Sequence, residues 1–250
     1  MIELSKKLIR QVGQANAKFR LIEEGDRVLL GLSGGKDSLA LAHLLERMRR
    51  HAPFSFEFQT ATLSYGMGED YSQLHAHCEA HGIKHSVIES EIYAISEESI
   101  RENSSFCSYF SRMRRGALYT YALERGCNKL ALAHHLDDAA ESFFMSFMYN
   151  GVLRTLAPIY EAKRGIKVIR PLIFVRERQL RANAEANALQ VIGNEFCPGL
   201  KLSEKNVKYP HAREEAKALL SSLERDNPRL FTSLKRAFFN VHIKSFWSEA

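Results

Sequence analysis

Apolar and polar residues alternate along this chain in a pattern that predicts strands and helices in turn. Short apolar runs that suit buried strands occur at 28–32, 54–63, 84–90, 129–133 and 168–172. Apolar residues recur at helical spacing over 4–17, 38–51, 71–81, 117–125, 138–148, 176–189, 211–225 and 228–239. The β-α-β-α-β order of the first half predicts an α/β fold with a doubly wound parallel sheet and right-handed crossovers.

The chain divides into three predicted parts. Residues 1–25 are expected to form an N-terminal helix, residues 26–190 the α/β domain, and residues 191–250 a small helical C-terminal extension. Within the domain, 159–167 predicts a hairpin-like excursion before the last strand. A chain of 250 residues is long enough for one such domain with an appendage, and it needs no cross-links to hold its core.

The composition is that of a globular protein. The chain is 45% hydrophobic and 26% charged, and no uncharged apolar run approaches the ~20 residues that cross a membrane. The N-terminus lacks a signal-peptide pattern, and four scattered cysteines do not suit a disulfide scaffold, so we expect a cytoplasmic protein with no membrane partner. A net charge of +6 suits an anionic partner, although many enzymes without a nucleic-acid partner are equally basic.

The first predicted strand runs into a polar, glycine-containing loop that opens a helix. The loop reads Ser33-Gly34-Gly35-Lys36-Asp37-Ser38. A strand, a glycine turn and a helix start together aim free backbone amides and the positive helix end at a phosphate. Gly34 and Gly35 permit close approach, the two serines add hydroxyl donors, Lys36 adds a charge, and Asp37 can hold a metal ion. The loop matches neither G-x-x-x-x-G-K-[ST] nor G-x-G-x-x-G, and a simple connecting turn is the alternative.

Two later strands end in residues that should reach the same edge of the sheet. The second strand ends at Leu63 before a glycine-rich loop, and the fourth ends before His134, His135 and Asp138. Ligands bind at the carboxyl edge of such sheets, so we predict that Leu63 and both histidines contact the nucleotide. Asp138 is predicted to hold Mg²⁺ together with the aspartate of the first loop, and helix capping is the alternative for it.

Cys107 stands just before three arginines, Arg112, Arg114 and Arg115. Nearby positive charge lowers the pKa of a thiol, which favours a nucleophilic thiolate. The same arginines could bind RNA phosphates. A small apolar cysteine beside a charged helix face is the alternative that the local sequence leaves open.

Histidines also cluster around the third predicted helix, at His75, His77, His81 and His85, together with Cys78. Their spacing fits no closed zinc pattern, and three of them fall in one polar helix. We therefore interpret them as solvated surface.

Several motifs resemble one family. Ser33–Ser38 resembles the PP-loop of the ATP pyrophosphatases, and Ala133–Ser142 resembles the G-H-H-x-D-D-x-x-x-T element of the tRNA 2-thiocytidine synthetases. The second element is also similar to that of the tRNA lysidine synthetases. Further matches to the 2-thiocytidine synthetases lie at Cys107, 111–116, 149–151, 157–158, 168–172, 176–177, Arg213, Lys217 and 240–241.

This resemblance implies an ATP- and Mg²⁺-dependent enzyme that adenylates the C2 carbonyl of a cytidine in tRNA and replaces its oxygen by sulfur. It implies catalytic roles for Lys36, Asp37, Cys107 and Cys197. The implied partners are tRNA and a sulfur donor such as a cysteine-desulfurase persulfide, and the sequence leaves a homodimer open. Two alternatives also stay open: an adenylating ligase or amidase of the lysidine type, and a non-catalytic tRNA-binding relative.

The sequence departs from the family at its cysteines. The resemblance implies a [4Fe–4S] cluster on three cysteines drawn from two Cys-x-x-Cys pairs, but Phe110 and Asn194 occupy one position of each pair. Cys107 and Cys197 remain at matching positions, and clusters are usually held by four thiolates. This argues against a cluster and leaves a second route, in which one cysteine carries a persulfide and the other releases sulfur by forming a disulfide.

Overall fold

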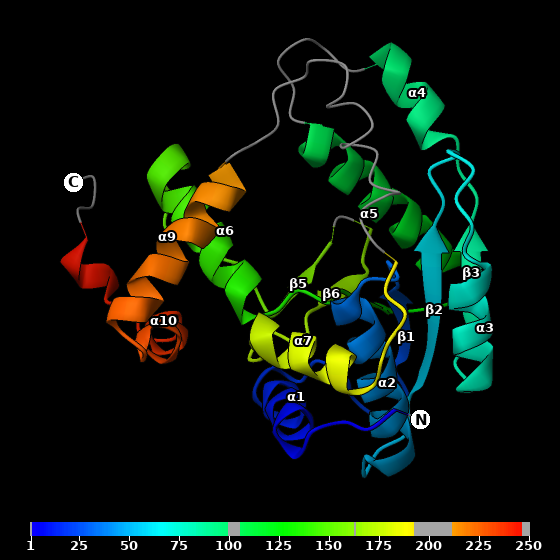
Figure 1. The fold of residues 1–250 in the computed structure, drawn as a ribbon, viewed down its shortest axis with the longest axis horizontal. Helices are drawn as coiled ribbons and strands as arrows, with labels where there is room; N and C mark the ends of the chain where they lie inside the picture. The colour runs from blue at the N-terminus through cyan, green and yellow to red at the C-terminus, as the bar shows by residue number, and fades with distance from the viewer. Residues whose placement is uncertain (1, 100–105, 163, 193–211, 247–250) are drawn as a thin grey trace.

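The computed structural model describes residues 2–99, 106–162, 164–192 and 212–246, and Figure 1 labels their elements. The strands are β1 (Arg27–Gly31), β2 (Glu57–Leu63), β3 (His85–Ile88), β4 (Lys129–Ala131), β5 (Ile159–Glu161) and β6 (Lys167–Ile169). The helices are α1 (Lys6–Phe19), α2 (Lys36–His51), α3 (Ser72–Ala80), α4 (Ile92–Ser99), α5 (Phe106–Glu124), α6 (Leu136–Asn150), α7 (Glu177–Ala186), α9 (Ala212–Asp226), α10 (Leu230–Ala237) and the 3-10 turn η2 (Ile243–Ser245).

The described strands form one sheet in the order β3-β2-β1-β4-β6-β5. The pairs β2–β3, β1–β2, β1–β4 and β4–β6 are parallel. β5 is antiparallel to β6, which confirms the predicted hairpin-like excursion. The chain leaves β3 at one edge and returns to β4 beside β1, so the strand order reverses between β1 and β4. The α/β, doubly wound fold is confirmed, and this reversal point is where such sheets bind ligands.

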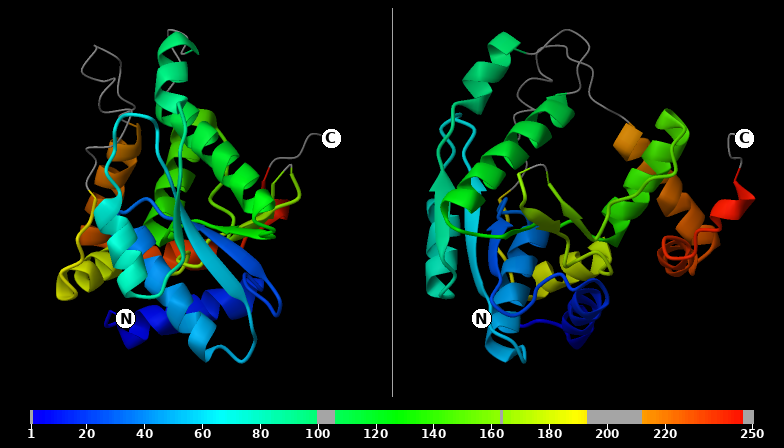
Figure 2. Two further views of the ribbon diagram at one scale, coloured as in Figure 1. Left: turned by 90° about the vertical axis from the view of Figure 1, so that its right-hand side faces the viewer. Right: turned by 180° about the vertical axis from the view of Figure 1, so that it is seen from behind.

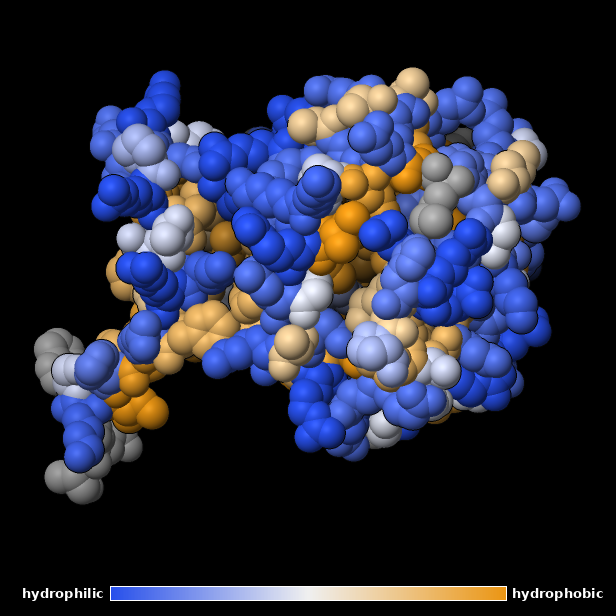
Figure 3. All heavy atoms as spheres, turned by 90° about the horizontal axis from the view of Figure 1, so that it is seen from below, coloured by the Kyte–Doolittle hydropathy of each residue, from blue (hydrophilic) through white to orange (hydrophobic). Residues whose placement is uncertain are grey.

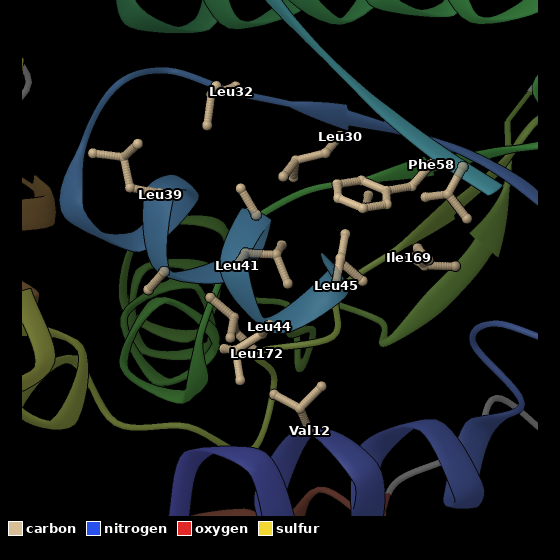
Figure 4. Packing of buried hydrophobic residues seen from close by; sticks show 14 of the residues in the cluster. Val12, Leu30, Leu32, Leu39, Leu41, Leu44, Leu45, Phe58, Ile169 and Leu172 are labelled. Atoms are coloured by element: carbon tan, nitrogen blue, oxygen red, sulfur yellow. The ribbon is translucent and has the colours of Figure 1, made fainter. Parts of the chain in front are cut away.

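Helices cover both faces of the sheet, as the views in Figures 1 and 2 show. On one face, apolar side chains of α1, α2, α3 and α7 form the main core with Leu30 of β1. Figure 4 shows Leu41 of α2 and Val12 of α1 within this core. On the other face, Leu118 of α5 packs with Leu29 of β1. Adjacent residues of a strand point to opposite faces, so one apolar run supplies both cores.

α6, α9 and α10 form a packed group beside the sheet (Figure 1). Leu136 and Ala140 of α6 pack with Leu220 of α9 and Phe231 of α10. α6 starts a few residues after β4, so this group stands at the carboxyl edge of the sheet. It thereby brings α9, from the C-terminal part of the chain, to the edge where the predicted site lies.

Many exposed apolar side chains belong to the end of α6, the residues after it, and the chain after α10. They are Phe147, Met148, Tyr149, Val152, Leu153, Phe239, Val241, Ile243 and Phe246. The face drawn in Figure 3 is largely hydrophilic, with apolar residues in a central hollow and on the arm at the left. Among the described helices, none has both the length and the apolar character of a membrane span.

The helices around Cys107 differ from the prediction. α4 was not predicted, and α5 begins at Phe106 rather than at residue 117. Phe110, Met113 and Ala117 face one small core at helical spacing. The helix expected over 117–125 therefore continues from the stretch that carries Cys107.

Candidate nucleotide-binding and active site

The loop 33–38 joins β1 to α2 at the reversal point and is held by its own serines. The Ser33 amide donates to Ser38 Oγ at 3.2 Å, and Ser38 Oγ donates to the Gly35 carbonyl at 3.0 Å. Gly34 has φ +78°, a conformation that costs a side-chain-bearing residue about 1–2 kcal/mol. The prediction that glycine is needed in this loop therefore has a conformational basis at Gly34.

The amino end of α2 is open, while that of α6 is closed. In the part of the chain that the structure describes, no side chain caps α2, so the amides of its first turn, Lys36 to Ser38, are available to a ligand. At α6, by contrast, His135 Nδ1 accepts from the Asp138 amide and Asp138 Oδ2 accepts from the His135 amide. A phosphate is therefore expected at α2 and not at α6.

A cavity of about 380 Å³ lies between the ends of β1, β2 and β4. Its lining residues come from the first loop, the end of β2, α5 and the β4–α6 connection. They are Gly31, Leu32, Ser33, Gly35, Asp37, Ser38, Ala61, Thr62, Leu63, Tyr65, Tyr71, Arg114, Leu118, Leu132, Ala133, His134, Asp138 and Ile192. The structure thus brings the predicted Leu63, His134 and Asp138 together with the first loop. The lining combines apolar side chains with a few polar ones, which suits a nucleotide.

The two carboxylate oxygens of Asp37 differ in their surroundings. Its Oδ2 contacts Lys36 Nζ at 3.3 Å and lies 3.9 Å from His135 Nε2. Its Oδ1 is buried, and the structure describes no hydrogen-bond partner for it. Burial raises the pKa of Asp37, against the lowering charges of Lys36 and His135. A buried, unpartnered carboxylate oxygen at the mouth of a phosphate site fits a Mg²⁺ ligand.

Lys36 points to acidic residues and not into the cavity. Its Nζ lies 3.2 Å from Glu177 Oε1 of α7, and Lys217 of α9 contacts Glu177 Oε2 at 2.8 Å. Burial raises the pKa of Glu177, but the two lysines outweigh it and lower that pKa to about 2. Glu177 therefore stays ionised and holds the predicted catalytic lysine beside Asp37.

Asp138, the second predicted metal ligand, has both carboxylate oxygens engaged. Oδ2 accepts the His135 amide at 2.9 Å, and Oδ1 accepts from Arg213 of α9. Arg213 also donates to Glu141 Oε2 at 2.8 Å. Asp138 is the third residue of α6, and His135 is the N-cap of this helix. The two residues form a capping box, so the helix-capping role that was the alternative for Asp138 is present.

His134 faces the cavity, whereas His135 is turned toward Asp37 and does not line it. Burial lowers the pKa of His134 to about 4, and the charge of Asp138 opposes this only in part. His134 is therefore neutral at pH 7. His135 Nδ1 accepts the Asp138 amide, which places its own proton on Nε2, toward Asp37.

The predicted roles of the two cysteines concern residues that the structure describes only in part. Cys197 and Asn194 lie outside them, and for Cys107 the structure describes the backbone, which places it in the first turn of α5. Phe110 is 5% exposed and packs with Leu63 and Ile92. At this position the chain thus uses a core side chain that cannot ligate iron.

Sequence reasoning did not assign Tyr65, Tyr71 or Ile192 to the site, and it considered Arg114 only beside the cysteine. Both tyrosines line the cavity: Tyr65 lies in the glycine-rich loop after β2, and Tyr71, predicted as the first residue of a helix, immediately precedes α3. Ile192 donates its amide to the Gly34 carbonyl at 3.1 Å, a contact over a long sequence separation that local patterns do not reveal. Arg114 lies one helical turn after Phe110, so a helix predicted from residue 106 onward would have placed both side chains on the same face.

Known proteins resemble this chain over most of its length. A family model described as a PP-loop domain matches residues 4–195. A tRNA-cytidine(32) 2-sulfurtransferase from Geobacter metallireducens is 41% identical over 94% of this chain and 90% of the relative, and one from Pseudomonas fluorescens is 36% identical over 96% and 85%. The solved U34-tRNA thiolase NcsA from Methanococcus maripaludis, with its [4Fe-4S] cluster, has a TM-score of 0.75 at 25% identity, covering 93% of this chain and 77% of that one. These matches confirm the resemblance drawn from the motifs, and the chain belongs to the PP-loop domain family, among the tRNA-cytidine(32) 2-sulfurtransferases.

Proposed function

We propose that this chain is an ATP-dependent tRNA sulfurtransferase that adenylates the C2 carbonyl oxygen of a cytidine and replaces it by sulfur. The observation that carries the proposal is the meeting of two elements at one cavity: the open helix start after β1, and His134 with Asp138 after β4. Kinship to named tRNA-cytidine(32) 2-sulfurtransferases supports the substrate class.

ATP would lie along the cavity with its phosphates at α2. The amides of the first turn of α2 and the Ser33 and Ser38 hydroxyls would bind the phosphates. Leu63, Tyr65 and Tyr71 supply the apolar and aromatic wall expected for adenine. This orientation directs the α-phosphorus toward the β4 side of the cavity, where His134 lies.

Mg²⁺ would bind the free Oδ1 of Asp37. The ion would supply charge neutralisation for the pyrophosphate that leaves. Asp138 would join it only by giving up its contact with Arg213, so Asp37 is the stronger candidate of the two predicted ligands.

In the first step, the C2 carbonyl oxygen of cytidine forms a bond to the α-phosphorus, and the bond to the β-phosphate oxygen breaks. Pyrophosphate leaves with the electron pair. The amides of α2 and Lys36, released from Glu177, would stabilise the charge on the leaving group. His134 is neutral and can hydrogen-bond to the activated base at the wall of the cavity.

In the second step, sulfur attacks C2 and AMP leaves. We propose that Cys107 or Cys197 carries a persulfide from a protein donor, and that its outer sulfur bonds to C2. The thiolate of the other cysteine then attacks the inner sulfur, which breaks the S–S bond and leaves a disulfide. A thiol reductant restores both cysteines. This route uses no iron, in keeping with the core position of Phe110.

The test is the reaction itself, run with the full chain, a tRNA transcript, ATP, Mg²⁺ and a persulfide donor. We expect 2-thiocytidine in the digested tRNA, with AMP and pyrophosphate formed only when tRNA is present. Loss of thiolation in both Cys107→Ser and Cys197→Ser supports the two-cysteine route, and full activity in both rules it out. AMP formation with no sulfur product would favour the ligase alternative, and no ATP turnover at all would favour the non-catalytic one.

A further inference from the structure

Three histidines meet between α2 and α3, outside the ATP cavity. His43 comes from the middle of α2, and His77 and His81 lie four residues apart on α3 and at its end. One ring nitrogen from each can be chosen so that all three lie within 4.8 Å of one another. The His43 and His77 Nε2 atoms are 2.9 Å apart, and none of the three residues lines the cavity.

His43 is an unusual residue for the leucine-rich core that surrounds it. Its exposed fraction is 0%, its Nδ1 has no hydrogen-bond partner in the described chain, and its Nε2 faces another imidazole. Burying a polar ring with so little compensation is costly, and an apolar side chain would fill the space more cheaply. The position therefore calls for an interaction that only an imidazole can make.

A hydrogen bond to a carbonyl fixes the tautomer of His81. His81 Nδ1 lies 2.8 Å from the His77 carbonyl, which can only accept, so Nδ1 bears the proton and Nε2 carries a free lone pair. His43 is fully buried and its Nε2 lies 2.9 Å from His77 Nε2, so these two rings already face each other at the cluster. A carbonyl partner on the outer nitrogen is the usual support for a metal-ligating histidine.

We propose that His43, His77 and His81 form a binding site for Zn²⁺ that joins α2 to α3. Three imidazoles with an open fourth position are a zinc ligand set, and His77 and His81 are partly exposed, which leaves that position to water. Zn–N bonds of ~2.0–2.1 Å at tetrahedral angles place ligand nitrogens ~3.4 Å apart. The His43–His77 pair needs to open by only about 0.5 Å to admit the ion.

The alternative is a stack of neutral rings with no metal. The ring pairs are 4.4 to 5.1 Å apart, and His43 meets both partners edge-on, a geometry that aromatic packing also favours. Metal binding distinguishes the two, because ring packing gives no saturable affinity for a cation.

Co²⁺ serves as the spectroscopic probe, in the full chain carrying Cys107→Ser and Cys197→Ser so that thiolates do not compete. After treatment with EDTA, we expect one Co²⁺ per chain with the visible absorption of a low-coordinate site, and displacement of Co²⁺ by added Zn²⁺. His77→Ala and His81→Ala should each weaken binding at least ~10-fold. His75→Ala is the matched control, because His75 is exposed on the same helix and contacts His85 instead.

Thermal unfolding gives an independent measurement. Zn²⁺ should raise the midpoint of the parent and of His75→Ala, but not that of His43→Leu, which fills the core position without a ligand. Circular dichroism checks that each variant is folded. The proposal is overturned if the parent binds no stoichiometric Co²⁺, or if folded His77→Ala and His81→Ala bind it as tightly as His75→Ala.

Discussion

Adding one methyl group at Gly34 should destabilise the loop 33–38, which we propose binds the nucleotide, for two separable reasons. The φ of +78° there disfavours any side chain, at a cost of about 1–2 kcal/mol. A Cβ would also lie 2.6 Å from Ile192 Cδ1 and 2.9 Å from its Cβ and Cγ1. Since the whole side chain of Ile192 must shift, we add an overpacking cost of about 1–3 kcal/mol. Gly34→Ala should therefore lower the free energy of unfolding by roughly 2–5 kcal/mol.

Gly25→Ala is the matched control for the backbone part. Gly25 also has φ +78°, but a Cβ there meets no described atom within 4 Å. Its substitution should cost only about 1–2 kcal/mol. Urea unfolding of both variants and the parent, followed by circular dichroism, gives the two costs.

A double-mutant cycle with Ile192→Ala isolates the steric part. In that background the methyl group at Gly34 has room, so the cost of Gly34→Ala should fall by about 1–3 kcal/mol. Equal costs for Gly34→Ala and Gly25→Ala, or an unchanged cost in the Ile192→Ala background, would refute the placement of Ile192 on the loop. Titration with ATP should show weaker binding for Gly34→Ala and parental binding for Gly25→Ala.

The other predictions concern the charged groups of the site. Asp37→Asn should reduce tRNA-dependent AMP formation at least ~100-fold. The unfolding midpoint should stay unchanged, because burial already disfavours the ionised carboxylate. Parental turnover would show that Asp37 is not a metal ligand. Arg213→Ala should cost about 1–3 kcal/mol in urea unfolding, because it leaves Glu141 buried without its partner, and adding Glu141→Gln should recover part of that loss. Folding lowers the pKa of His134 from 6.5 to about 4, so between these pH values the unfolded chain binds a proton that the folded chain does not. The contribution of His134 to the free energy of unfolding is therefore complete above pH 6.5 and is lost as the pH falls toward 4. His134→Asn should flatten this part of the stability–pH curve, and a curve identical to the parent's would contradict the assignment.

The fold and the ends of the strands could be predicted because they follow from local patterns. The apolar runs located β1, β2 and β4, and the polar residues after each of them gave the loop 33–38, Leu63 and His134. Parallel strands place their carboxyl ends on one edge, so neighbours in space could be inferred without knowing any long-range contact. Strand lengths were less accurate. β4 and β6 end at Ala131 and Ile169, where their shared ladder ends, although the apolar runs continue.

Contacts between distant segments could not be predicted. His43 looks like an ordinary helix residue until α3 packs against it, so the histidines of α3 were interpreted as solvated surface. His75 is exposed, as that interpretation requires, while His77 and His81 are partly buried against His43. Likewise, nothing near Arg176 in the sequence indicates that its guanidinium is shared between Asp137 and Glu224. A charged residue's partner is set by the tertiary structure, and local sequence carries no record of it.

The ion pairs made by α9 explain how an acidic site can receive two polyanions. Asp138, Glu141 and Glu177 stand close to the proposed ATP site, and unpaired they would repel an incoming triphosphate or RNA backbone. Arg213 neutralises the first two and Lys217 the third, from a helix outside the sheet. These cations are half exposed, so the pairs can rearrange at low cost when phosphate or Mg²⁺ arrives. Asp37 can accept a metal ion on its unpartnered Oδ1 without breaking any of these ion pairs. We therefore expect metal binding to depend on Asp37, and the charge balance of the site to depend on the cations of α9.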